Sequence, residues 1–151
     1  MKHREIMTQF STALGKLDMA YALVAQEYNL TFNGLMTLYI IDESDTVTQK
    51  EISQILFLPK STVHSLLSKL QKQDILELTK GKNEKEKFVV FTANGRKVFE
   101  EIQEQTDIFE SQVIEEFGLK NTQAFLEHTQ AFTESLLEKA RRVMEDKKDE
   151  N

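Results

Sequence analysis

The sequence contains no cysteine, one proline and five glycines among its 151 residues. The absence of cysteine excludes disulfides, thiolate metal sites and cysteine-based redox sensing. The scarcity of proline and glycine indicates a mainly helical chain. No segment approaches the roughly 18 apolar residues that a membrane span needs, and the start MKHREIMTQF has no apolar run of the signal-peptide type. We therefore expect a cytoplasmic protein with no membrane partner.

The composition is that of a globular protein, with 40% hydrophobic and 29% charged residues. The length suits one domain spanning residues 1–151. The net charge of -6 hides an asymmetry, because residues 47–97 carry ten Lys and Arg against five acids, whereas the remainder carries nine against twenty. Only the central third is therefore suited to an anionic partner.

Two short helices joined by a tight corner are predicted in this basic third. Thr48 followed by Glu51 forms a capping box, so a helix begins at Gln49 with Ile52, Ile55 and Leu56 on one face. The only proline, Pro59, suits the first position of a second helix, which is expected to end near Gln73. Its buried stripe consists of Val63, Leu66, Leu67 and Leu70. This pattern is typical of a helix-turn-helix.

The outward face of the second helix carries no acidic residue between Pro59 and Gln73, although the chain as a whole is acidic. Short hydroxyl side chains, one imidazole and lysines remain, and such a face can approach phosphates and present donors to base edges in a major groove. The alternative is an ordinary solvated face that happens to be basic.

After Gln73 the hydrophobic pattern changes from helical to alternating. Residues 75–79 and 88–91 are rich in strand formers, and the charged segment 81–87 supplies a turn between them. A hairpin after a helix-turn-helix makes a winged helix, so the expected fold class is mainly α with a small two- or three-stranded β wing. Lysines in the turn can contact phosphates or a minor groove, although a solvated hairpin tip also tolerates them.

Long amphipathic helices are predicted on both sides of this module. One covers residues 3–28, a shorter one capped by Thr31 covers 32–41, one begins after Thr92 and stops at Gly118, and the last begins near Asn121. We expect residues 31–92 to form a DNA-binding lobe, and residues 1–30 and 93–147 to form dimerisation helices. Intramolecular core packing is the alternative for these stripes.

This order of elements resembles the multiple antibiotic resistance regulator (MarR) family of bacterial transcription factors over nearly the whole chain. The resemblance rests on Thr48-Gln49-Lys50-Glu51-Ile52, Ser61-Thr62-Val63, Leu70 before Ile75-Leu76, and Phe91-Thr92-Ala93-Asn94-Gly95, where the family has Leu-Thr-x-x-Gly. It implies a homodimer that binds a pseudo-palindromic operator in double-stranded DNA, usually as a repressor released by a small aromatic or anionic effector. The candidate DNA-contacting residues are Thr48, Gln49, Lys60, Ser61, Thr62, His64, Ser65, Lys69, Lys82, Lys85 and Lys87.

Three positions depart from the family pattern. Ser65 stands where arginine is common, which shifts attention to His64, Lys60 and Lys69. Asn83-Glu84-Lys85 replaces Asp-x-Arg in the wing, and lysine lacks the planar fork of arginine. Asp74 replaces a usual glycine, although aspartate tolerates left-handed backbone at some cost.

Other functions have weaker support. An enzyme is not expected, because there is no Gly-rich phosphate loop and no supported nucleophile. No cofactor or metal is expected, since His3, His64 and His128 are far apart in sequence. A winged-helix module that binds a protein and has lost specific DNA recognition is the main alternative. The effector is not revealed, because Met19, Leu23, Phe32, Met36 and Tyr39 have the spacing of core residues.

Overall fold

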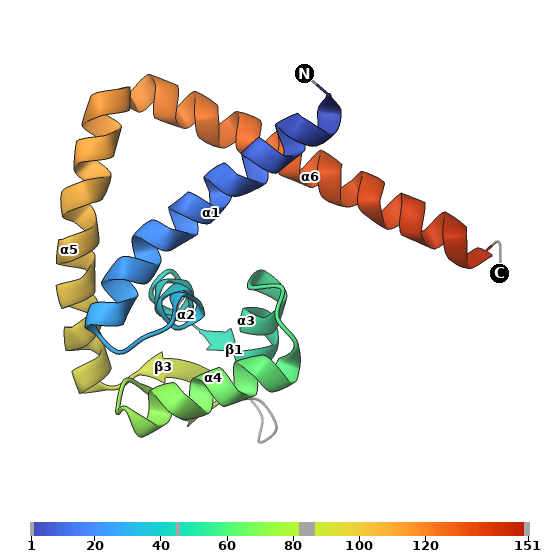
Figure 1. Ribbon diagram of the computed structural model, residues 1–151. Coiled ribbons are helices and arrows are strands. Elements are labelled where there is room, and N and C mark those ends of the chain that lie inside the picture. Colours follow the sequence, from blue (N-terminus) through green and yellow to red (C-terminus); the bar gives the residue numbers. More distant parts are fainter. Residues whose placement is uncertain (1, 45, 82–86, 150–151) are drawn as a thin grey trace. The chain divides into compact units, whose positions relative to one another are not determined.

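The computed structural model describes residues 2–44, 46–81 and 87–149, the side chains of 147–149 excepted (Figure 1). It divides into two compact units, Met1–Thr106 and Asp107–Asn151, which are described separately below. The fold is mainly helical with a small sheet, so the predicted fold class is confirmed. The predicted limits of the DNA-binding lobe and the dimerisation helices stay predictions.

The first unit begins with two helices, α1 (His3–Glu27) and α2 (Phe32–Asp42). The hydroxyl of Thr31 accepts a hydrogen bond from the backbone N–H of Gly34 at 3.0 Å, which satisfies a donor at the start of α2. Both helices and the Thr31 cap agree with the predictions within one residue at each end.

The sheet has three antiparallel strands, β1 (Val47–Thr48), β2 (Leu76–Lys80) and β3 (Lys87–Phe91), in the order β1-β3-β2. Val89 of β3 pairs with Val47 on one side and with Leu78 on the other, so β3 is the central strand. The two strands of the hairpin were predicted within one residue at each end. The two-residue strand β1 is too short to show an alternating pattern, which explains why the sequence did not indicate it.

A single hydrophobic core joins the helices of the first unit to this sheet. Leu35 and Leu38 from α2, Val63 and Leu70 from the second helix of the helix-turn-helix, and Phe99 are almost completely buried. Burial of a side chain of this size contributes about 1.5–3 kcal/mol. The remaining core residues are Ala25, Leu30, Ile41, Val47, Ile52, Leu67, Ile75, Leu76, Val89 and Ile102.

Helix α5 (Ala93–Phe117) starts in the first unit and continues into the second. Gly118, at φ 83°, ends it in a left-handed conformation, as predicted. Helix α6 (Leu119–Asp149) follows at once. The predicted start near Asn121 is two residues late, because α6 begins at Leu119, directly after Gly118.

The second unit exposes a large amount of apolar surface. Between residues 107 and 146 no side chain is buried. Phe117, Leu119 and Phe125 are 65%, 61% and 59% exposed. Other exposed apolar residues of this unit are Ile108, Val113, Ile114, Leu126, Phe132, Leu136, Leu137, Val143 and Met144. Exposed apolar side chains in this number are typical of an interaction site.

Candidate nucleic-acid interface

The first helix of the helix-turn-helix, α3 (Gln49–Ile55), starts with the predicted capping box. The hydroxyl of Thr48 accepts from the N–H of Glu51 at 3.3 Å, and the Glu51 carboxylate accepts from the N–H and the hydroxyl of Thr48, both at 2.8 Å. The hydrogen bonds from the Thr48 backbone and side chain lower the pKa of Glu51 below its ordinary value of 4.5. The carboxylate thus fixes the point where α3 begins.

The turn between the two helices differs from the prediction in two ways. Ile55, expected on the buried face of α3, is 52% exposed, because α3 ends there and the chain has already left the core. Pro59 is the N-cap of the next helix and not its first residue, since its ψ of 145° is extended. The turn is fastened by Ser53, whose hydroxyl donates to the carbonyl of Leu58 at 2.7 Å.

Phe57 in this turn combines two unusual properties. Its φ is 53°, a left-handed conformation that bulky residues rarely adopt, and its side chain is 79% exposed. The N–H of Leu58 donates to the carbonyl of Ser53 at 3.1 Å. The hydrogen bonds on both sides of Phe57 therefore hold the turn in this conformation.

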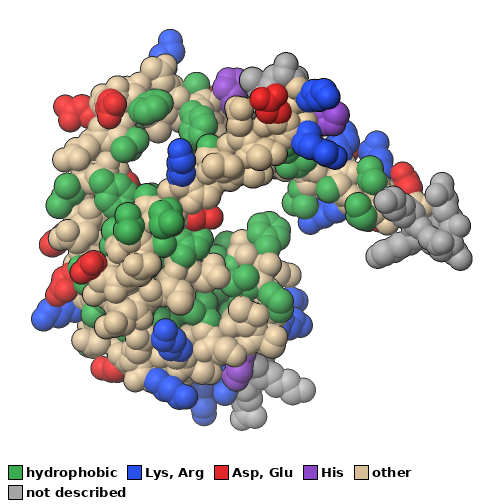
Figure 2. All heavy atoms as spheres, in the orientation of Figure 1, with side chains coloured by type: hydrophobic (Ala, Val, Ile, Leu, Met, Phe, Trp, Pro, Cys, Tyr) green, Lys and Arg blue, Asp and Glu red, His purple; other side chains and the backbone are tan. Residues whose placement is uncertain are grey.

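The second helix, α4 (Lys60–Lys72), has its apolar stripe in the core and a basic face in solvent. Val63, Leu67 and Leu70 are buried, whereas Leu66 is only partly buried. The predicted residues Lys60, Ser61, Thr62, His64, Ser65 and Lys69 are all exposed. In Figure 1, α4 runs along the lower edge of the first unit, and Figure 2 shows Lys and Arg side chains gathered along that edge. The structure thus brings six of the predicted contact residues together on one helix face.

The N-terminal ends of α3 and α4 lie close together. The Gln49 side-chain amide donates to the carbonyl of Lys60 at 3.3 Å, and Pro59 offers no side-chain cap to α4. The first N–H groups of α4 are therefore left for solvent or for an anion, which the helix dipole also favours. The Ser65 hydroxyl donates to the carbonyl of Ser61 at 3.1 Å, so it lies back against its own helix.

The predicted wing is described only in part. Lys87 is exposed at the start of β3 and pairs with Lys80 at the end of β2. Lys82 and Lys85 lie outside the described residues. Lys80 and Lys87 place two cations next to each other where the hairpin enters the loop.

The C-terminal end of α4 is joined tightly to the start of α5. Asp74 adopts a left-handed φ of 57°, and its carbonyl accepts from the Thr92 hydroxyl at 2.7 Å and the Asn94 amide at 3.1 Å. A Cβ on Gly95 would lie 1.8 Å from the carbonyl oxygen of Ile75, so only glycine fits there. The segment Phe91-Thr92-Ala93-Asn94-Gly95 therefore holds the start of α5 against Asp74 and Ile75.

A second set of contacts joins α5 to the end of α2. Arg96 forms an ion pair with Asp42, and its guanidinium lies 4.3 Å from the centre of the Phe91 ring. The Gln103 amide donates to Asp42 at 3.2 Å. Further along, the Tyr39 hydroxyl and the Thr106 hydroxyl are 2.8 Å apart. The first four turns of α5 are therefore held by both α2 and the β2–β3 hairpin.

Sequence reasoning missed several of these roles. The hydrogen bond from Gln49 to Lys60 joins residues that are not adjacent in sequence, so no local pattern predicts it. The same holds for the hydrogen bonds that Thr92 and Asn94 donate to the carbonyl of Asp74. Met36 and Tyr39 pack against the core, as their spacing indicated, whereas Met19 and Leu23 are both 60% exposed, so the core interpretation is wrong for these two residues.

Two other kinds of site are absent from the described part of the chain. Among the described residues, no group of three or more His, Asp or Glu side chains is arranged to hold a metal ion. None of the helices, within the ranges given above, is both long and apolar enough to cross a bilayer.

The three-stranded sheet, the α3–α4 corner and the basic face of α4 define a winged helix-turn-helix protein. Residues 28–85 match the sequence model of the MarR family. The transcriptional regulator SarZ of Staphylococcus aureus is 27% identical over 96 residues, which are 63% of this chain and 65% of SarZ. The regulator YwoH of Bacillus subtilis, itself uncharacterised, is 30% identical over 88 residues, which are 58% of this chain and 64% of YwoH. The matched region thus spans a little under two thirds of each relative.

Solved structures show the same fold over a longer part of the chain. The Staphylococcus aureus MepR–DNA complex has a TM-score of 0.74 at 17% identity and covers 87% of this chain and 97% of MepR. Staphylococcus aureus MarR with salicylate and kanamycin has a TM-score of 0.74 at 18% identity and covers 89% of this chain and 92% of that protein. The resemblance to the MarR family predicted from the sequence is therefore confirmed.

Proposed function

We propose that this protein is a transcriptional regulator that binds a pseudo-palindromic DNA site as a homodimer, most simply as a repressor. The outward face of α4 carries the proposal: Lys60, His64 and Lys69 lie among short hydroxyl side chains, with no acid on the helix. Small side chains allow a close approach to a major groove, and the uncapped start of α4 suits a phosphate. In this proposal the protein is cytoplasmic and is not an enzyme.

The contact residues divide into two roles. Lys60 and Lys69, together with Lys82, Lys85 and Lys87 in the wing, supply charge for the phosphate backbone. Ser61, Thr62 and His64 present short polar groups to base edges, and the Ser65 hydroxyl, whose hydrogen is donated to the Ser61 carbonyl, offers an acceptor. Thr48 and Gln49 are already engaged in the hydrogen bonds described above, so they act mainly by holding the two helix starts against the DNA backbone.

The exposed apolar residues of α5 and α6 support the homodimer. They are spread over the second unit, which has no buried side chain between residues 107 and 146, so a second copy of the chain is the occupant that we propose for this surface. Two copies would then place two α4 helices on successive half-sites about one helical turn apart.

A small aromatic or anionic effector is part of the same proposal. It is supported by the family resemblance and by the salicylate bound to the similar Staphylococcus aureus MarR. The proposed action is a change in the separation of the two α4 helices when the effector binds.

The test is selection from a random duplex library with the purified protein, followed by titration against salt. An enriched inverted repeat is expected, and contacts to roughly 6–10 phosphates should reduce the affinity by about three to five decades between about 50 and 200 mM salt. Lys60→Ala should lower the magnitude of the salt slope by about 2, one phosphate contact for each protomer of the dimer, and His64→Ala should relax the base preference.

The matched control is the double variant Lys16→Ala, His128→Ala, which removes the same residue types from exposed positions on α1 and α6. It should keep the affinity and the base preference of the parent protein. Failure to enrich any palindrome, with a salt slope near zero for all duplexes, would contradict the DNA-binding proposal and favour a protein partner for the same face.

A further inference from the structure

Phe57, in the turn between α3 and α4, is a large apolar side chain that the fold hardly uses. It is 79% exposed, so its ring gains little from burial. Its φ of 53° lies in the left-handed region, which glycine adopts freely and a bulky residue adopts only at a cost. Single exposed apolar residues are common on proteins, but their combination with an unfavourable backbone is not. The Phe57 side chain therefore lowers stability without a return inside the chain, which points to a contact outside it.

The surroundings of this turn are basic. From Ile52 to Gln73 the sequence contains three lysines and no Asp or Glu. Glu51, the acid that precedes this segment, has its carboxylate engaged by the backbone and side chain of Thr48. A stretch with lysines and no acids is complementary to a polyanion. Phe57 is therefore an apolar group in a part of the chain whose charge suits nucleic acid.

The turn is also close to the start of α4. Lys60 follows Phe57 by three residues, so their Cα atoms are at most about 11 Å apart, and the major groove is about 12 Å wide. The Ser53 hydroxyl donates to the carbonyl of Leu58 at 2.7 Å, and the Gln49 amide donates to the carbonyl of Lys60 at 3.3 Å. These bonds hold the turn to α3 and hold the starts of α3 and α4 together. Because the start of the second helix of a helix-turn-helix contacts base edges, Phe57 is within reach of the same groove.

The major groove contains one apolar group that a phenyl ring can contact, the C5-methyl group of thymine. We propose that Phe57 packs on a thymine methyl group in each half-site and so adds a base preference that the polar side chains of α4 do not supply. The inference rests on the proposed function and extends it to a residue outside the polar face of α4. A protein partner for the turn is the competing outcome of the test.

The test removes the methyl group and the ring separately. Each thymine of the selected duplex is replaced, together with its symmetry-related partner, by deoxyuridine, which lacks only the methyl group. The affinity of the full chain is then measured for the parent and for Phe57→Gly. One symmetric pair of replacements should weaken the parent by about fifteenfold, about fourfold for each methyl group. The same pair should leave the affinity of Phe57→Gly unchanged.

Two further variants separate the ring from the backbone. Phe57→Tyr keeps the ring and should keep the discrimination between thymine and deoxyuridine. Phe57→Asn lacks an apolar side chain but, like glycine, tolerates the left-handed conformation, so it should lose this discrimination without adding a flexible glycine to the turn. Urea denaturation checks the fold: Phe57→Gly should unfold at a higher urea concentration than the parent, because the strain at this residue is relieved.

The outcomes distinguish this inference from the proposed function. Deoxyuridine replacements that weaken the parent and Phe57→Gly equally, or that weaken neither, would overturn the contact with thymine and favour a protein partner for the turn. In both cases the parent still binds its selected duplex, so the DNA-binding proposal would stand. A parent protein that selects no duplex would instead contradict both.

Discussion

Asp74 adopts a backbone conformation that glycine adopts more easily. Its φ of 57° lies in the left-handed region, which crowds a Cβ against the following carbonyl. Only the carbonyl of Asp74 is used in the junction with α5, where it accepts from Thr92 and Asn94. Its side chain is exposed and contributes little to that junction. The strain at this residue therefore comes from its Cβ.

We expect Asp74→Gly to raise the free energy of unfolding by about 0.5–1 kcal/mol, because the left-handed strain is relieved while both hydrogen bonds to the carbonyl remain. Urea denaturation of the variant and the parent at the same protein concentration measures this difference. DNA affinity should not change, since α4 keeps its exposed face.

Glu77→Gly is the control for this prediction, since Glu77 lies in β2 with extended backbone and is also exposed. There the same substitution should lower the free energy of unfolding by about 0.5–1 kcal/mol, because glycine only adds freedom to the unfolded chain. A loss of stability in Asp74→Gly equal to that in Glu77→Gly would show that the strain argument is wrong.

At the scale of the element, α3 depends on the capping box at its start. The helix has only 7 residues, and helices this short need stabilisation from their ends and from tertiary packing. Thr48 and Glu51 stabilise the start of the helix, and the buried side chain of Ile52 supplies the tertiary packing. The ionised Glu51 carboxylate therefore contributes to the stability of the start of α3.

We expect Thr48→Ala to lower the free energy of unfolding by about 1 kcal/mol at neutral pH. The lowered pKa of Glu51 adds a pH dependence of defined sign: its contribution is fully present above the ordinary value of 4.5 and is lost as the pH falls through the lower pKa of the folded state. Denaturation midpoints at neutral pH and below pH 4.5 measure both effects.

Glu51→Gln isolates the charge, since glutamine can also complete a capping box. The parent should be more stable than this variant at neutral pH, and the two should converge as the pH falls, because only the parent loses a carboxylate. The pH dependence of all other acids cancels in this comparison. A stability difference that is the same at both pH values would rule out the charge of Glu51 as its cause.

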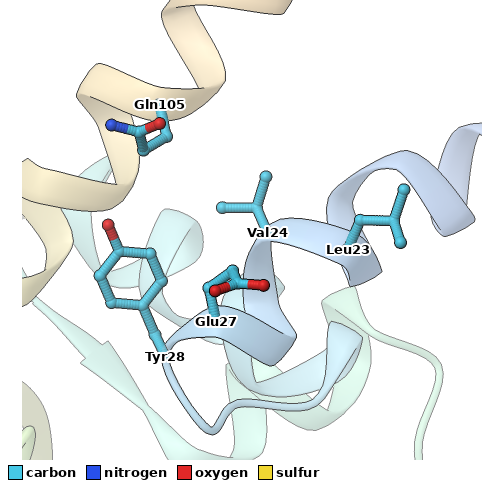
Figure 3. Close-up of a pocket in the computed structure, with 5 residues that line it drawn as sticks. All are labelled: Leu23, Val24, Glu27, Tyr28 and Gln105. Carbon is cyan, nitrogen blue, oxygen red and sulfur yellow. The ribbon is translucent and has the colours of Figure 1, made fainter.

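These elements show which features of the fold can be predicted from the sequence. The capping box, the Thr31 cap and the stop at Gly118 were predicted because each depends on a few adjacent residues. The exposure of Ile55 and the strand β1 were missed, because they depend on where the chain turns and which strand it meets. A cleft lined by Leu23, Val24, Glu27, Tyr28 and Gln105 (Figure 3) was also missed, since these residues come together only when α1 and α5 pack in the first unit.

At the scale of the whole molecule, the exposed apolar residues of α6 form the surface that we propose for the homodimer interface. Phe125 and Leu136 are 59% and 45% exposed on this helix. We expect the double variant Phe125→Asp, Leu136→Asp to shift the protein from dimer to monomer, because two charges would have to be buried in the proposed interface. Sedimentation velocity over a range of concentrations measures the shift.

The control for this variant is Gln123→Asp, Gln130→Asp, which adds the same two charges at exposed polar positions of α6. It should remain dimeric. The monomeric variant should also show about half the salt slope of the parent on DNA, since one half-site supplies about half the phosphate contacts. A dimer of unchanged strength in the Phe125, Leu136 variant would place the interface elsewhere.

The close approach of Gly95 to Ile75 has a mechanical consequence. Helix α5 has 25 residues and is therefore about 37 Å long, and it is anchored at its first turn to the end of α4 with no space for even a methyl group. A change in the direction of α5 at Gly95 therefore requires Ile75, which follows the end of α4, to move with it.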